Sequence, residues 1–214
     1  LDLGYIVSDV PAAAAGVYTT NVFQAAPLIL TQESIAKENK IQAILVNSGN
    51  ANACTGEQGL LDAAEMQKRF ADELGIQPHL VAVTSTGVIG ELLPMECINT
   101  GIKQILQSEF EQEENFKQSI LTTDTCIKQI GVQIKIDGHT ISIGGAAKGS
   151  GMIHPNMATM LGFVTTDANI AQEDLLAALK DVTNQTFNMI TVDGDTSTND
   201  MVLVMANGLA GNEQ

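Results

Sequence analysis

The sequence is poor in basic residues, and it has no apolar run long enough to cross a membrane. Ten lysines and arginines stand against 25 aspartates and glutamates, which gives a formal net charge of −15 over 214 residues. Nucleic acids and anionic membrane surfaces are bound through basic patches. We therefore expect neither as a partner, and we interpret the acidic balance as that of an ordinary soluble surface.

Cysteine and histidine are also scarce, with three of each. Cys54, Cys97 and Cys126 are widely spaced, and no pair has the C-x-x-C spacing. Neither a zinc site nor a disulfide framework is therefore predicted, and we expect no metal. The first residues lack the basic segment followed by an apolar segment that marks a secretory signal. These features favour a reducing cytoplasm.

Helical and strand-like apolar patterns are mixed along the whole sequence. The predicted helices cover residues 31–39, 57–74, 94–108, 115–121 and 173–187. The predicted strands cover residues 41–46, 80–84, 126–136, 140–143, 160–164 and 201–205. No repeat, linker or low-complexity tract marks a boundary. The sequence therefore predicts a single α+β domain over residues 1–214.

Several local features refine this prediction. Thr31 is the expected N-cap of its helix, and residues 85–90 are expected to form a glycine-bearing loop. Asp137 and Gly138, between two apolar runs, are typical of a tight hairpin turn. The buried face of helix 57–74 is expected to contain Leu60, Ala64, Ala71 and Leu74.

Two polar segments invite a binding role. Residues 47–56, NSGNANACTG, combine permissive glycines with exposed amides, although such turns often bind nothing. Residues 193–200, DGDTSTND, suggest a calcium loop but have Thr198 and Val204 where an EF-hand needs glycine and glutamate. We therefore expect a hydrogen-bonded polar turn there, near the active site.

The stretch from Lys148 to Asp167 passes from a flexible, glycine-containing segment into an apolar run. Thr159 lies at this loop-to-strand boundary. A threonine freed at its own N-terminus can act as a nucleophile, because its α-amine is neutral near physiological pH and can take the hydroxyl proton. This chemistry requires cleavage between Ala158 and Thr159. By local composition alone, a threonine at the start of an apolar run is most often an ordinary strand residue.

The segment from Lys148 to Leu161, KGSGMIHPNMATML, resembles the self-cleavage and nucleophile motif of the ornithine acetyltransferase (glutamate N-acetyltransferase) family of arginine biosynthesis. Residues 47–56 match that family's Asn-x-Gly-x-Ala-Asn-Ala-x-x-Gly pattern. The resemblance covers nearly the whole sequence. It implies layered sheets flanked by helices, as in the ornithine acetyltransferase and self-processing aminopeptidase-like fold. Because the family continues for a comparable length, the sequence looks truncated.

The resemblance also implies roles for individual residues. Self-cleavage between Ala158 and Thr159 would give an α chain, 1–158, and the start of a β chain, 159–214, with Thr159 as the nucleophile. Thr86 and Gly87 match the oxyanion-hole pair, although a structural turn is the alternative.

Substrate contacts are implied for Thr125, Lys148 and Thr159 itself. An isolated lysine is more often a solvated surface residue. Lys148, however, lies between Ala147 and Gly149, which leave room for a ligand carboxylate.

The implied reaction is transfer of an acetyl group from N2-acetylornithine to glutamate without a bound cofactor. Some family members also accept acetyl-CoA, which makes it a further candidate donor. The implied partners are these small molecules, the α and β chains of one precursor, and other αβ units in a homo-oligomer. Two alternatives remain at this stage: a self-processing amidohydrolase or aminopeptidase, and an amino-acid-binding protein without catalysis.

Overall fold

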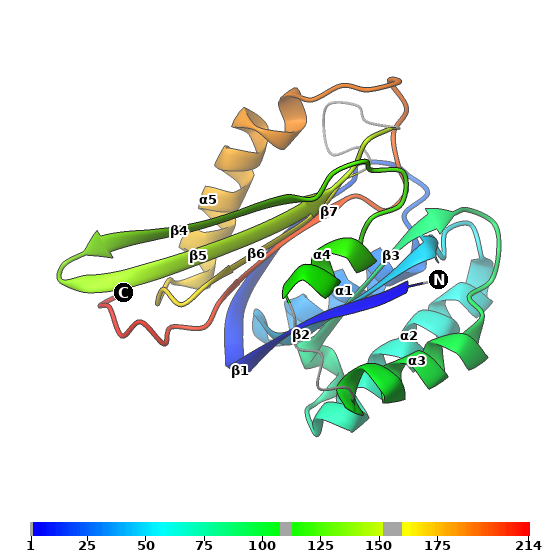
Figure 1. Ribbon diagram of the computed structural model, residues 1–214, viewed down its shortest axis with the longest axis horizontal. Coiled ribbons are helices and arrows are strands. Elements are labelled where there is room, and N and C mark those ends of the chain that lie inside the picture. The colour runs from blue at the N-terminus through cyan, green and yellow to red at the C-terminus, as the bar shows by residue number, and fades with distance from the viewer. Residues whose placement is uncertain (1, 108–112, 152–159) are drawn as a thin grey trace.

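The computed structural model describes residues 2–107, 113–151 and 160–214. Its strands in these ranges form one seven-stranded sheet in the order β3-β2-β1-β7-β6-β5-β4 (Figure 1). The strands are β1 (Asp2–Tyr18), β2 (Lys40–Asn50), β3 (Val81–Val88), β4 (Lys128–Ile136), β5 (His139–Lys148), β6 (Leu161–Thr166) and β7 (Met201–Ala206). The helices are α1 (Ala26–Glu38), α2 (Gly56–Leu74), α3 (Met95–Gln107), α4 (Glu113–Ser119) and α5 (Gln172–Gln185), with single 3-10 turns at Pro78–Leu80 and Phe187–Met189. The α+β prediction is confirmed.

Strand β1 joins the two halves of the sheet. Its first part pairs with β2 and its last part, from Ala13 to Tyr18, pairs with β7. The pairing with β2 shifts register between Val7 and Ala12. Pro11 lies in this irregular stretch, which is where a residue without a backbone N–H is tolerated in a sheet. The sequence patterns did not predict β1, because its alanine-rich second half carries little strand signal.

The two halves of the sheet share one core, to which helices α1 and α4 also contribute. Ile44 of β2 and Ala82 of β3 share one buried core cluster with Phe163 of β6 and Leu203 of β7. Four strands separate β3 from β5 in the sheet order. Even so, a side chain at the end of β5 hydrogen-bonds to one near the end of β3. The sheet is therefore folded over, and the ends of distant strands meet at one place.

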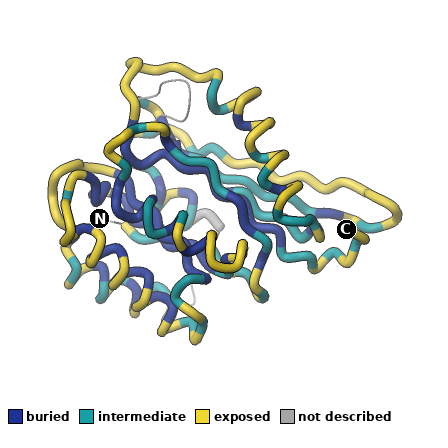
Figure 2. The backbone as a smooth tube through the Cα atoms, turned by 180° about the vertical axis from the view of Figure 1, so that it is seen from behind, coloured by how far each residue is buried: buried dark blue, intermediate teal, exposed yellow. Residues whose placement is uncertain are grey.

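Helices α2, α3 and α5 cover the outer faces of this folded sheet, whereas Leu28 of α1 and Phe116 of α4 pack in the core that its two halves share (Figures 1 and 2). On the β2–β3 half, Phe70 of α2 and Ile98 of α3 pack in one buried cluster with Leu45. On the other half, Leu175 of α5 packs against Val204. Figure 2 shows the buried strands between helices whose outward sides are exposed. Within the described ranges, no helix is long and apolar enough to span a membrane.

Two details of the predicted helices were wrong. Helix α1 begins at Ala26, so Thr31 is not its N-cap but a buried residue within it. The Thr31 Oγ1 accepts the backbone N–H of Val83 at 2.9 Å and donates to the Val83 carbonyl at 2.8 Å. Thr31 therefore covers the free edge of β3, where unpaired backbone groups need partners.

Helix α2 is confirmed at residues 56–74, but its buried face is offset from the predicted one. Leu60 is 42% exposed, and Ala64 is also exposed. The side that packs on the sheet contains Gly59, Ala63, Met66, Phe70 and Ala71. The predicted hairpin between β4 and β5 is confirmed, with positive φ angles at Asp137 (49°) and Gly138 (86°).

Candidate active site

The candidate site forms where the folded sheet brings strand ends together. Residues 197–200, just before β7, are all buried. The Asn199 side-chain amide donates to the carbonyls of Ser85 at 2.9 Å and Ala51 at 2.6 Å. Because Ala51 directly follows β2 and Ser85 lies in β3, the 193–200 segment links the two halves of the sheet. It is a hydrogen-bonded polar turn, as predicted, and it adjoins Thr86.

Lys148 and Thr86 make the central contact of this region. Lys148 ends β5 and is 3% exposed, while Thr86 lies in β3 and is 5% exposed. The Lys148 Nζ donates to the Thr86 Oγ1 at 2.5 Å. Since the hydroxyl oxygen accepts this bond, the Thr86 O–H remains available as a donor. Sequence reasoning identified both residues but did not predict that they touch.

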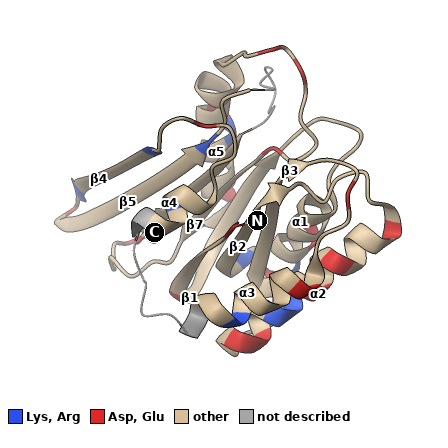
Figure 3. Cartoon of the chain, turned by 45° about the vertical axis from the view of Figure 1, so that its right-hand side comes forward, with Lys and Arg blue, Asp and Glu red and all other residues tan. Residues whose placement is uncertain are grey.

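The charge of Lys148 is balanced by acidic neighbours. Burial lowers the pKa of its ammonium, while the charges of Asp124 and Asp200 act in the opposite direction and Lys128 lowers the pKa further. The net result is a pKa below the ordinary lysine value. On α2, by contrast, Lys68 and Arg69 form exposed pairs with Asp72 and Glu65. Figure 3 shows basic and acidic residues on this helix.

Gly87 lies where the β3 backbone passes close to the end of β2. Strand β3 continues to Val88, so the loop predicted at residues 85–90 begins later than expected. Gly87 has a φ of +135°, and a Cβ there would lie 2.2 Å from the Gly49 carbonyl carbon and 2.5 Å from the Asn50 nitrogen. Only glycine allows this approach without moving backbone.

Gly87→Ala should therefore destabilise the full-length protein more than Gly90→Ala. Gly90 also has a positive φ, +88°, but a Cβ there would meet nothing within 4 Å. The control change costs about 1–2 kcal/mol for the left-handed backbone alone. The clash at Gly87 should add roughly 1–3 kcal/mol. Urea unfolding followed by circular dichroism measures both, and equal midpoints would show that the close approach does not constrain Gly87.

A buried carboxylate that sequence reasoning missed joins two of the predicted site segments. The Asp124 side chain has no exposed area. Its Oδ1 accepts a hydrogen bond from the backbone N–H of Gly149 at 2.8 Å and forms an ion pair with the Lys128 ammonium. Burial by itself would raise its pKa, but these hydrogen bonds and the charges of Lys128 and Lys148 lower it overall. Asp124 is therefore anionic at neutral pH. Its one sequence signal is its position beside Thr125, which is exposed.

The family model for ArgJ matches residues 1–214, which is the whole sequence. The chain belongs to the ArgJ family. It is 63% identical to the arginine biosynthesis bifunctional protein ArgJ of Bacillus licheniformis over 213 residues, covering 100% of this chain and 52% of that protein. The chain thus spans about half the length of the curated ArgJ relatives that it matches.

Solved structures agree with this membership. An ornithine acetyltransferase from Mycobacterium tuberculosis, complexed with ornithine, is 31% identical, with a TM-score of 0.62 over 72% of this chain and 83% of that one. A serine aminopeptidase from Ochrobactrum anthropi, a variant of the Ntn hydrolase fold, is only 10% identical. Its TM-score is 0.53 over 94% of this chain and 62% of that one, a likeness of fold alone. The predicted ornithine acetyltransferase and aminopeptidase-like architecture is confirmed.

The predicted nucleophile, Thr159, and the predicted cleavage site between Ala158 and Thr159 lie outside the described residues. The strand that follows them is described. Leu161 pairs with both Lys148 and Met201, and the Met201 N–H donates to the Met160 carbonyl at 3.1 Å. The chain therefore enters β6 directly beside the end of β5 that carries Lys148.

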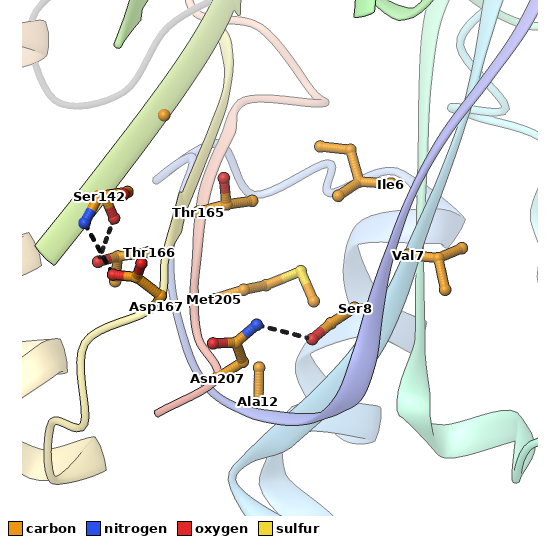
Figure 4. Close-up of a pocket in the computed structure, with 11 residues that line it drawn as sticks. Ile6, Val7, Ser8, Ala12, Ser142, Thr165, Thr166, Asp167, Met205 and Asn207 are labelled. Atoms are coloured by element: carbon orange, nitrogen blue, oxygen red, sulfur yellow. Dashed lines mark hydrogen bonds between the residues drawn. The ribbon is translucent and has the colours of Figure 1, made fainter. Parts of the chain in front are cut away.

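A separate cavity lies at the opposite ends of β5 and β6 (Figure 4). It has a volume of about 280 Å³, and its polar groups bond to one another. Asp167 accepts the Ser142 N–H at 2.8 Å, and Asn207 donates to Ser8 at 3.3 Å. None of the predicted site residues lines it. In the described ranges, no three histidine, cysteine or acidic residues gather as a metal site would require.

Proposed function

We propose that the full-length protein transfers an acetyl group from N2-acetylornithine to glutamate through an acetyl-Thr159 intermediate. The single observation that carries this proposal is the Lys148–Thr86 hydrogen bond at 2.5 Å. It unites a predicted substrate contact with a predicted oxyanion donor, beside the strand that follows Thr159. Membership of the ArgJ family supports it, as does the ornithine acetyltransferase among the similar structures.

The reaction begins when the Thr159 Oγ attacks the acetyl carbonyl of the donor. The Thr159 α-amine takes the hydroxyl proton, and the carbonyl oxygen becomes negative. The Thr86 O–H and the Gly87 N–H donate to this oxygen. Collapse of the intermediate breaks the amide C–N bond, the proton passes to the leaving nitrogen, and ornithine departs. The α-amine of glutamate then attacks the threonine ester, which forms N-acetylglutamate and restores the Thr159 hydroxyl.

Lys148 can strengthen the oxyanion site through Thr86. Its ammonium donates to the Thr86 Oγ1, which withdraws electron density from the hydroxyl and makes the O–H a stronger donor. The contact also fixes the hydroxyl, so that little reorganisation is needed as negative charge develops. In the substrate-contact role implied by the family resemblance, the same ammonium would instead bind a substrate carboxylate.

Several wider features belong to the same proposal. Cleavage between residues 158 and 159 would create the free Thr159 amine and the α and β chains. The αβ units would assemble as a homo-oligomer in the cytoplasm, and acetyl-CoA is a further candidate donor. A self-processing hydrolase would share the first half of the reaction, with water in place of glutamate.

The processed enzyme mixed with N2-acetylornithine alone should release ornithine in a burst of up to about one equivalent per site, followed by slow hydrolysis. Rapid quenching and mass spectrometry should find one added acetyl group on the peptide that begins at Thr159. Adding glutamate should discharge it as N-acetylglutamate, because a transferase protects its acyl-enzyme from water.

The outcomes of this experiment separate the alternatives. Continued fast release of ornithine without glutamate, at a rate that does not rise when glutamate is added, would identify a hydrolase. Ornithine that appears only when both substrates are present would contradict a covalent intermediate. The Thr140→Ala variant, altered at an exposed threonine of the β5 hairpin, should keep the full burst.

A further inference from the structure

The segments that carry Thr125 and Lys148 are joined by a small set of contacts. Asp124 accepts the Gly149 N–H at 2.8 Å, and the Thr123 and Ser150 hydroxyls lie 2.8 Å apart. Thr125 directly follows Asp124, and Lys148 directly precedes Gly149. One buried carboxylate therefore sets the distance between two residues that are 23 positions apart in the sequence.

The carboxylate of Asp124 is buried, and only one of its two oxygens is hydrogen-bonded within the part of the chain that the structure describes. Its side chain has no exposed area, and its Oδ2 has no hydrogen-bond partner among the described residues. A buried carboxylate with an unsatisfied oxygen is costly unless nearby positive charge compensates it. Lys128 supplies one such charge by direct contact, and Lys148 acts on Asp124 electrostatically.

We infer that Asp124 is a positioning residue for the acetyl-transfer site. Its carboxylate holds Thr125 against the end of β5 and keeps Lys148 as an ammonium that donates to Thr86. The inference rests on the proposed function for its kinetic consequences. The electrostatic effect of Asp124 on the Lys148 ammonium does not depend on the proposed function. A neutral amide at position 124 could still accept the Gly149 N–H, but it would no longer balance the buried ammonium.

The pH dependence follows from the groups that face Lys148. Asp124 and Asp200 raise the pKa of its ammonium, whereas burial and Lys128 lower it. Removing the Asp124 charge should therefore lower the pKa of Lys148, and removing the Lys128 charge should raise it. If the ammonium is needed, activity is lost as pH rises through that pKa. The alkaline limb of the pH–activity profile should move to lower pH in Asp124→Asn and to higher pH in Lys128→Gln.

The experiment compares both variants with wild-type full-length protein and with Asp72→Asn. Asp72 is a matched control, because it also pairs with a lysine four residues away, on the exposed side of α2. Asp124→Asn should raise KM for N2-acetylornithine roughly 10- to 100-fold, with a smaller change in kcat. The reason is that a neutral side chain loses the ion pair with Lys128 and accepts the Gly149 N–H more weakly, so that Thr125 and Lys148 are held less precisely. Asp72→Asn should leave KM and the pH profile unchanged.

A readout without catalysis separates this inference from the proposed function. In protein labelled with 13Cε-lysine, the Lys148 signal, assigned by its loss in Lys148→Arg, should titrate at lower pH in Asp124→Asn and at higher pH in Lys128→Gln. Unchanged titration in Asp124→Asn would overturn the inference, even if acetyl transfer is confirmed. Absent transfer in wild type, with opposite shifts in the variants, would defeat the function and keep the role of Asp124. If Asp124→Asn does not fold, Asp124→Glu keeps the charge and should leave the Lys148 titration close to that of wild type, and a large shift in Asp124→Glu would overturn the inference.

Discussion

Thr159→Ala should leave the full-length protein as one polypeptide and remove acetyl transfer. Alanine has no hydroxyl to attack the Ala158 carbonyl, so the bond stays intact and no free α-amine forms. Loss of both nucleophile and base should lower kcat/KM roughly 10⁴-fold or more. A denaturing gel and N-terminal sequencing of the wild type should show a second chain that begins at Thr159.

The conservative Thr159→Ser variant controls for this effect. Serine keeps the hydroxyl and the potential α-amine, so it should still be cut and should retain part of the activity. A new terminus at another residue in the wild type would place the nucleophile elsewhere. Cleavage and transfer that persist in Thr159→Ala would reject the N-terminal threonine mechanism altogether.

The sequence predicted the elements with strong local signals. The hairpin at Asp137 and Gly138 and the helix at residues 56–74 both depend on neighbouring residues, through a two-residue turn and through helical periodicity. Strand β1 was missed because its pairing partners, β2 and β7, lie far away in the sequence and its alanines have weak strand preference. Thr31 was misplaced for a similar reason, since its partner Val83 is 52 residues away.

In the candidate site, too, the residues in local motifs were predicted and the long-range contacts were not. Thr86, Gly87, Thr125 and Lys148 were predicted as site residues by resemblance to family motifs, and the structure brings Thr86 and Lys148 into contact. That contact could not be predicted locally, because its two residues are 62 positions apart and meet only through the folding of the whole sheet. Asp124 escaped notice because a single aspartate in a polar segment carries no motif, and only burial reveals its importance.

Thr86→Val should lower kcat and kcat/KM together by roughly 10²- to 10³-fold, as expected when a main oxyanion donor is lost. Valine keeps the shape of threonine but lacks the hydroxyl that accepts from Lys148 and donates to the substrate oxygen. Thr86→Ser should retain most of the activity. Each variant must first be shown by gel to be cleaved, since the same donor can serve self-processing. A cleaved and fully active Thr86→Val would remove Thr86 from the site.

Combining Thr86→Val with Lys148→Met then distinguishes two roles for the lysine. If Lys148 acts by holding and polarising the Thr86 hydroxyl, its loss has no further effect once that hydroxyl is absent. The double variant should then be about as slow as Thr86→Val alone, because residues that act as one unit have non-additive effects. If Lys148 instead binds a substrate carboxylate, Lys148→Met should chiefly raise KM, and the two effects should multiply in kcat/KM. The 2.5 Å contact between Nζ and Oγ1 favours the non-additive result.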